Sequence, residues 1–297
     1  MTDDIIRISG GVGGLCAEVN TLGAELWSLR DGEGRDLLWN GDAKFWTGRA
    51  PILFPIVGAV AGDRYRVGGK SYTLPRHGFA RRRRFSVLEA HDSRVTLRLA
   101  SDDATRAVYP FEFVLDLTFA ITGARLDVTA DLTNAGDGPL PASFGYHPAF
   151  LWPLPYGAAR ADHAIHFDAA ETARIFRPDA HGLLDPAAQP SPVDGRTLRL
   201  DDSLFVDGAL VFTELAGRGA TFGASTGPRL RIDYPDSPHL GIWSLPSAPF
   251  VCTEPWQGYA DPAGFDGEIW DKPGIVRLDP GAKRSWRMGI ELRAAEI

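Results

Sequence analysis

The sequence predicts an all-β protein built as a sandwich of many short antiparallel strands. Apolar and polar residues alternate with a period of two almost throughout the 297 residues, as in strands that bury one face. The 33 glycines and 22 prolines are spread along the chain, which places turns between short strands and argues against a long disordered linker. We find no strong amphipathic helix longer than two turns. This pattern predicts a single domain over residues 1–297, with long, wide sheets.

Five segments carry the alternation most clearly. In the strongest, residues 125–133, Leu126 and Val128 begin an apolar face that is opposed by a polar one. The segment before it joins through a turn at 121–124, which predicts a β-hairpin. The last segment predicts a strand that ties down the C-terminus. The irregular, proline-rich stretch 177–195 predicts an extended surface loop. The alternating segments are 15–19, 95–99, 113–119, 125–133 and 286–292.

Composition limits the partners. With 44% hydrophobic residues the chain can bury a large core, and 31 basic against 38 acidic residues give a net charge of -7. That charge argues against duplex nucleic acid or an anionic membrane as the main partner and favours a small neutral or locally compensated ligand. Cys16 and Cys252 each lie in a strand-like apolar stretch, which favours two buried thiols over a disulfide. No secretory signal or spanning run is visible, so we expect a soluble cytoplasmic protein.

Two stretches, 143–150 and 250–256, each set one titratable side chain among aromatic and small apolar residues. These side chains are His147 and Glu254, and they form an acid/base pair if the fold brings them together, because apolar surroundings raise the pKa of a carboxylic acid. The alternatives are a buried structural histidine and a glutamate ion-paired with an arginine. Glu254 is expected at a strand end beside Trp256, whose indole offers a flat face for sugar C–H groups. The two residues are 107 positions apart, so only the fold can join them.

Three further features lie upstream. Arg49 precedes a run broken by two prolines, which predicts edge strand or loop backbone, and it is either a ligand clamp or a surface arginine. His77 precedes Gly78, where backbone can approach a ligand closely. The arginines at 81–84 favour a solvated strand face; if the run is extended, at most half of it faces any one site, which limits a polyphosphate or nucleic-acid interpretation.

A metal site is not predicted. His163 and His166 have Asp162 and Asp168 as neighbours and could suggest one, but no third ligand cluster at a familiar spacing supports it.

Five motifs in order carry a resemblance to a known family. They are APILFPIVG (50–58), LPRHGFAR (74–81), FGYHPAF (144–150), LFVDGALVF (204–212) and FVCTEPW (250–256). Together they resemble the aldose 1-epimerases, or galactose mutarotase-like proteins, and within them a LacX-like bacterial branch. The set is specific for the superfamily and less so for the substrate. The resemblance implies a galactose mutarotase-like β-supersandwich of one domain, with a sugar site on the concave face of a large sheet and no cofactor.

The resemblance also implies roles for individual residues. His147 resembles the general acid and Glu254 the general base of the family. Many relatives carry arginine directly after the glycine that matches Gly58, whereas this chain has Ala59, so a sugar contact is either lost or supplied by Arg64. The extra arginines at 82–84 are unusual and have no account from the sequence. The residues that resemble substrate contacts are His77, Arg49, Arg81 and Asp207.

The implied activity is that of an isomerase that interconverts the α and β anomers of a free aldohexose by opening the ring at C1–O5. Two alternatives stay open. One is mutarotation of a hexose 6-phosphate, suggested by Arg49, Arg81 and the arginine run, because a phosphate dianion needs charge-assisted donors. The other is a non-catalytic carbohydrate-binding or sensor protein that keeps the pocket. The expected partner is a small sugar, and the expected assembly is a monomer or homodimer.

Overall fold

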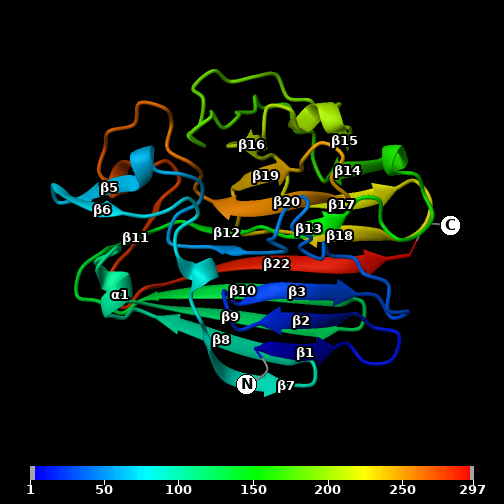
Figure 1. The fold of residues 1–297 in the computed structure, drawn as a ribbon, viewed down its shortest axis with the longest axis horizontal. Helices are drawn as coiled ribbons and strands as arrows, with labels where there is room; N and C mark the ends of the chain where they lie inside the picture. The colour runs from blue at the N-terminus through cyan, green and yellow to red at the C-terminus, as the bar shows by residue number, and fades with distance from the viewer. Residues whose placement is uncertain (1–3, 295–297) are drawn as a thin grey trace.

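The computed structural model describes residues 4–294, and their regular secondary structure is mainly strand. The largest sheet has nine strands (Figure 1). Their order is β15 (Thr197–Arg199), β14 (His163–Phe167), β17 (Gly219–Ala224), β18 (Arg229–Asp233), β22 (Lys283–Arg293), β10 (Arg125–Asn134), β9 (Phe113–Thr122), β8 (Arg94–Ala100) and β7 (Ser86–His91). Every pairing in this sheet is antiparallel.

A six-stranded sheet and three small ones complete the strands. The six-stranded sheet contains β16 (Leu210–Phe212), β19 (His239–Trp243), β20 (Phe250–Gln257), β12 (Phe144–Tyr146) and β4 (Ile52–Leu53), with β13 (Ala149–Leu151) also paired to β20. The small sheets are β1 (Ile5–Ser9) with β2 (Cys16–Asn20) and β3 (Glu25–Arg30), β5 (Arg64–Val67) with β6 (Lys70–Thr73), and β11 (Leu140–Ala142) with β21 (Val276–Leu278).

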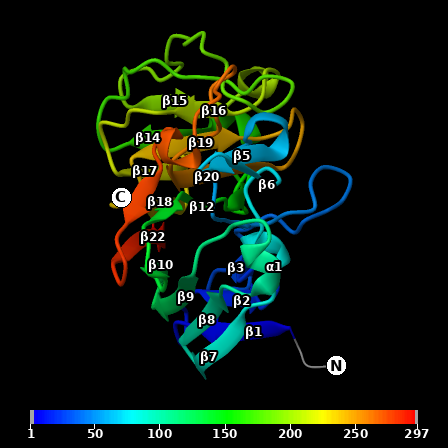
Figure 2. The same ribbon diagram turned by 90° about the vertical axis from the view of Figure 1, so that its left-hand side faces the viewer.

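The sheets form two layers around one large core. Figure 2 shows the nine-stranded sheet along one side, with the six-stranded sheet and β1–β3 together on the other. Between the layers, the ring of Phe144 on β12 stacks on Trp286 of β22, with 5.0 Å between ring centroids. The hydroxyl of Tyr146 donates to the Trp286 carbonyl at 2.7 Å, so the buried phenol is satisfied. The predicted all-β sandwich is confirmed.

The alternation in the sequence located several strands correctly. β9 and β10 form the predicted hairpin, and Leu126 on β10 lies opposite Ile121 on β9, both on the buried face. The turn contains Gly123 at φ 55°, a value that glycine adopts without steric cost. β22 is the predicted last strand and lies between β10 and β18. The predicted loop at 177–195 contains isolated bridges and no regular strand.

Helices are short, as predicted. The α1 helix (Asp103–Arg106) is a single turn, and the remaining helical segments of residues 4–294 are 3₁₀ turns. These are η1 (Ala61–Asp63), η2 (Ala80–Arg82), η3 (Arg160–Asp162), η4 (Asp202–Phe205) and η5 (Ile269–Asp271). Within the described chain, no helix has the length and apolar character that a membrane crossing needs.

Two expectations need correction. Cys16 is exposed, whereas Cys252 is buried, and both are free thiols. Cys16 lies on the outer face of β2, and the next residue, Ala17, points into the core. Alternation identifies a strand, but it does not show which of the two faces another sheet covers. The arginines at 81–84 do not form an extended face, because Ala80–Arg82 is the 3₁₀ turn η2.

Candidate active site

His147 lies in a break between two short strands that pair with the same neighbour. β12 ends at Tyr146 and β13 begins at Ala149, and both run antiparallel to β20. Pro148 in the break has no N–H to donate, and its carbonyl accepts from the N–H of Thr253 at 3.3 Å. The ladder is interrupted there, so His147 stands beside the middle of β20.

Glu254 comes from β20 itself. The prediction of a strand end at this residue is wrong, because β20 continues through Pro255 to Gln257. Pro255 faces the break between β12 and β13, where a strand needs no N–H, which explains how proline fits inside the sheet. On the other side, Glu254 lies opposite Gly241 of β19.

The fold brings the two titratable groups into contact. Nε2 of His147 lies 3.0 Å from Oε2 of Glu254, and the two side chains are 9% and 2% exposed. The contact lacks hydrogen-bond geometry, and Oε2 of Glu254 and Nδ1 of His147 have no hydrogen-bond partner among the described residues. Burial raises the pKa of Glu254 well above its usual value and lowers the pKa of His147 to about 3. Burial thus favours a protonated carboxylic acid at Glu254 and a neutral imidazole at His147. The carboxyl proton of Glu254 is the one that can pass to His147.

Aromatic rings enclose the imidazole of His147. Trp46 stacks on it with centroids 4.9 Å apart, and Trp243 meets it edge-on at 5.9 Å. His77 also meets it edge-on at 5.9 Å. The sequence does not predict Trp46 or Trp243 as site residues: Trp46 opens the stretch that contains Arg49, but no sequence pattern relates either indole to His147.

His77 is held in one orientation. Its Nδ1 accepts the N–H of Gly58 at 3.1 Å, which leaves the Nε2–H of the neutral ring as a donor. Burial lowers the pKa of His77 well below its usual value, and the nearby His147 and Arg81 lower it further. The neighbouring glycine is required: a Cβ at Gly78 would lie 2.2 Å from the carbonyl oxygen of Phe54.

Arg81 and Arg49, the two arginines expected to contact substrate, lie in different surroundings. Arg81 on η2 donates from Nη2 to the carbonyl of Arg76 at 2.8 Å, and its buried Nε has no partner among the described residues. Its charge contributes to lowering the pKa of His147, which puts it near the pair. The guanidinium of Arg49 instead lies 3.8 Å above the ring of Trp27 on β3 and donates to the Trp27 carbonyl at 2.7 Å. Arg49 is half-buried against β3, and among residues 4–294 its guanidinium contacts are to Trp27 and not to the pair.

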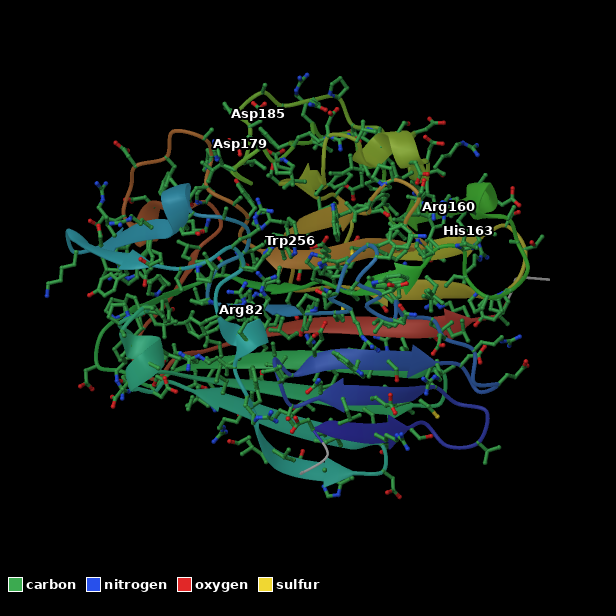
Figure 3. The ribbon with its side chains drawn as sticks, in the orientation of Figure 1. Arg82, Arg160, His163, Asp179, Asp185 and Trp256 are labelled. Carbon is green, nitrogen blue, oxygen red and sulfur yellow. The ribbon has the colours of Figure 1, made fainter. Side chains whose placement is uncertain are left out.

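Trp256 shares one face of β20 with Glu254, two residues away. The indole lies over two glycines: a Cβ at Gly241 would be 2.3 Å from it, and one at Gly145 would be 2.6 Å away. Its buried Nε1 has no hydrogen-bond partner among the described residues. Figure 3 shows Trp256 at one end of β20, with the loop of Asp179 and Asp185 above it in the view.

Asp207 and Arg64 are not brought to the pair. Asp207 is exposed after η4 and acts electrostatically on Arg177. Arg64 is exposed on β5 and lines a separate cavity of about 220 Å³. That cavity is also lined by Lys272 and Asp261, a buried ion pair at 2.8 Å. The N–H of Asp261 donates to the carbonyl of Ala59 at 2.9 Å, so this ion pair lies close to Ala59.

His163 has a structural role. Its Nε2 accepts the N–H of Leu154 at 3.0 Å and its Nδ1 lies 2.9 Å from the carbonyl of Ala159. Figure 3 shows His163 and Arg160 near each other on the right of the view, away from Trp256, which lies near its middle. The single group of three potential metal ligands within residues 4–294 is His147, Cys252 and Glu254.

A two-layer antiparallel sandwich with a buried imidazole–carboxylate contact on one sheet defines a galactose mutarotase-like protein. The chain belongs to the aldose 1-epimerase family, whose model matches residues 4–275. It is 31% identical to the chromosomal protein LacX of Lactococcus lactis subsp. lactis over 289 residues, covering 93% of this chain and 96% of that protein. These findings confirm the resemblance read from the five motifs, and family membership supports a carbohydrate epimerase with a sugar substrate.

Solved structures agree. A galactose mutarotase-like protein from Lactobacillus casei ATCC 334 superposes with a TM-score of 0.89 at 30% identity, over 97% of this chain and 100% of that one. A galactose mutarotase related enzyme from Lactobacillus acidophilus gives a TM-score of 0.89 at 28% identity, over 98% of each chain. The overall fold is therefore shared with these proteins over nearly the whole chain.

Proposed function

We propose that the protein is an aldose 1-epimerase that interconverts the α and β anomers of a free aldohexose. The observation that carries the proposal is the contact of 3.0 Å between Nε2 of His147 and Oε2 of Glu254 in a buried, aromatic site. Anomer interconversion requires one group that takes the proton of the anomeric hydroxyl and another that protonates the ring oxygen. A paired carboxyl and imidazole supply both within a single site.

The proton count of the pair fits this chemistry. Moving the one shared proton from Glu254 to His147 produces a carboxylate and an imidazolium without any exchange with solvent. Glu254 then takes the proton of the C1 hydroxyl while His147 gives its proton to O5, and the C1–O5 bond opens to the aldehyde. After rotation about C1–C2, the two residues reverse their roles and the ring closes as the other anomer. Each step of this reaction is a proton transfer by Glu254 or His147 with opening or closing of the C1–O5 bond, so it needs no metal or organic cofactor.

Neighbouring side chains would bind the sugar. We assign the Nε2–H of His77 and the free Nε of Arg81 as donors to ring or hydroxyl oxygens, because both groups lie near His147. Trp256 would offer its ring face to sugar C–H groups from the same face of β20 as Glu254. Arg49 and Asp207 lie farther from the pair, since their present partners are Trp27 and Arg177. They would contact only the part of the substrate that is remote from C1.

Polarimetry tests the activity. Freshly dissolved α-glucose and α-galactose should reach anomeric equilibrium faster with the protein than without it. The variants Glu254→Gln and His147→Asn should each lose about 10²–10⁴-fold in rate, which is the usual contribution of an acid or base. Asp137→Asn is the matched control, since it makes the same acid-to-amide change at an exposed residue in the turn between β10 and β11, outside the site. A Glu254→Gln enzyme with the wild-type rate would exclude the assignment.

Mutarotation of a hexose 6-phosphate is the second candidate, and the buried, unpartnered Nε of Arg81 favours it. Glucose 6-phosphate in the same polarimeter tests it: preference for the phosphate, with competition by inorganic phosphate, would replace the free sugar. The non-catalytic alternative predicts sugar binding without acceleration on any of these substrates.

We further propose that residues 1–297 act as one domain, as a monomer or homodimer, because one buried cluster contains side chains from Ile8 on β1 to Ile290 on β22. The cytoplasm is the proposed location, because the exposed free thiol of Cys16 suits a reducing compartment.

A further inference from the structure

A buried thiol lies next to the proposed acid/base pair and has no part in the proton transfers. Cys252, Glu254 and Trp256 project from the same face of β20, because alternate residues of a strand do. One ligand atom each from His147, Cys252 and Glu254 lies within 4.8 Å of the other two. All three residues are buried. Thiolate, imidazole and carboxylate are the three side-chain ligands that zinc takes in proteins.

We propose that His147, Cys252 and Glu254 bind a thiophilic divalent cation of the Zn²⁺ class, and that the bound ion inhibits the enzyme by occupying both members of the pair. The binding half of this inference is independent of the activity, whereas the inhibition half rests on the proposed epimerase function. Three protein ligands leave a fourth tetrahedral position open, as in sites that also hold water or substrate.

The distances allow the site to close on an ion. Zinc lies about 2.0–2.3 Å from nitrogen, oxygen and sulfur ligands, so ligand atoms in a tetrahedron are roughly 3.3–3.8 Å apart. Nε2 of His147 and Oε2 of Glu254 are already 3.0 Å apart, and no pair in the group of three exceeds 4.8 Å. Shifts of about 1 Å at the ends of the side chains are sufficient.

The charges also balance. On binding, the thiol of Cys252 and the carboxyl of Glu254 each lose one proton to solvent, and His147 binds as the neutral imidazole. The two negative ligands cancel the two positive charges of the ion, so a neutral unit stays in the buried site and the desolvation cost is limited. Because two protons leave, affinity for the cation rises with pH.

The ion can reach the site from the side of His147. The His147 side chain is 9% exposed, whereas Cys252 is fully covered and lies in a cluster with Ala149 and Phe250. Sugar that occupies the site should therefore compete with the cation.

Cobalt and zinc titrations test the proposal. Co²⁺ added to the wild-type protein should produce a near-ultraviolet thiolate-to-cobalt absorption band, which Cys252→Ser should lose and Cys16→Ser should keep. Zn²⁺ should slow mutarotation, EDTA should restore it, and the Zn²⁺ concentration for half inhibition should rise at least tenfold in Cys252→Ser. The melting temperature of each variant without metal shows whether it folds, and Glu254→Gln, which removes a different ligand, should weaken the cobalt band independently.

The possible results separate the two proposals. A wild-type protein without a thiolate band, or a band lost in Cys16→Ser and kept in Cys252→Ser, overturns the cation site. A wild-type protein that shows the band and accelerates no sugar overturns the epimerase function and leaves the cation site standing.

Discussion

Replacement of Gly241 by alanine should displace the indole of Trp256 and damage both stability and activity. The added Cβ would lie 2.3 Å from the ring, whereas ordinary contact begins at 3.4 Å, so the indole must move by about 1 Å. It has little room, because a second close approach holds the ring over Gly145. Overpacking of a dense core costs about 1–3 kcal/mol, and a displacement of about 1 Å next to reacting groups costs up to about 10²-fold in rate.

The assay combines thermal unfolding with polarimetry. At about 2–4 °C per kcal/mol for a chain of this size class, Gly241→Ala should melt several degrees below the wild type. Gly138→Ala is the matched control, since a Cβ there meets nothing within 4 Å. The double variant Gly241→Ala/Trp256→Phe should regain stability because the smaller ring leaves room for the methyl group. Should Gly241→Ala melt and turn over as the wild type does, the indole is not confined by the two strands and its proposed role fails.

Three further predictions concern groups outside the pair. A thiol reagent should modify one cysteine of the native protein, Cys16, and reach Cys252 only after denaturation; two fast-reacting thiols would contradict the burial of Cys252. Lys272→Met should lower the free energy of unfolding by about 3–5 kcal/mol in urea, because it leaves Asp261 charged and buried, and a Lys272→Met/Asp261→Leu protein should recover most of the loss. Burial lowers the pKa of His239 to about 4, below the unfolded value of 6.5, so the unfolded chain binds the extra proton and stability falls as pH drops from about 6.5 towards 4. At pH 5 this effect is about 2 kcal/mol, so in urea titrations the stability lost between pH 7 and pH 5 should be about 2 kcal/mol smaller in His239→Gln than in the wild type, because the other buried histidines contribute equally to both proteins.

The sequence by itself determined the strand pattern of this protein. In the hairpin of β9 and β10, alternation fixed both the strands and their buried face, because the side-chain period of a strand is two and one face must leave water. The apolar stretches around His147 and Glu254 marked both residues as candidates. The order of the five motifs indicated the family to which the chain belongs. Alternation did not show that Cys16 faces solvent, since that depends on which sheet covers β2.

Only the tertiary structure decided how the pair and its surroundings assemble. The contact between His147 and Glu254 requires the break between β12 and β13, which is a property of three strands and not of any one motif. Trp46 and Trp243 enclose the imidazole from loops and strands that the sequence does not relate to it, and Cys252 gains a possible metal-binding role only through its distance to the pair. A contact between residues more than a hundred positions apart leaves no pattern in the local sequence. Backbone geometry relates only residues that are close in the chain, whereas distant contacts are decided by how the side chains of the core pack.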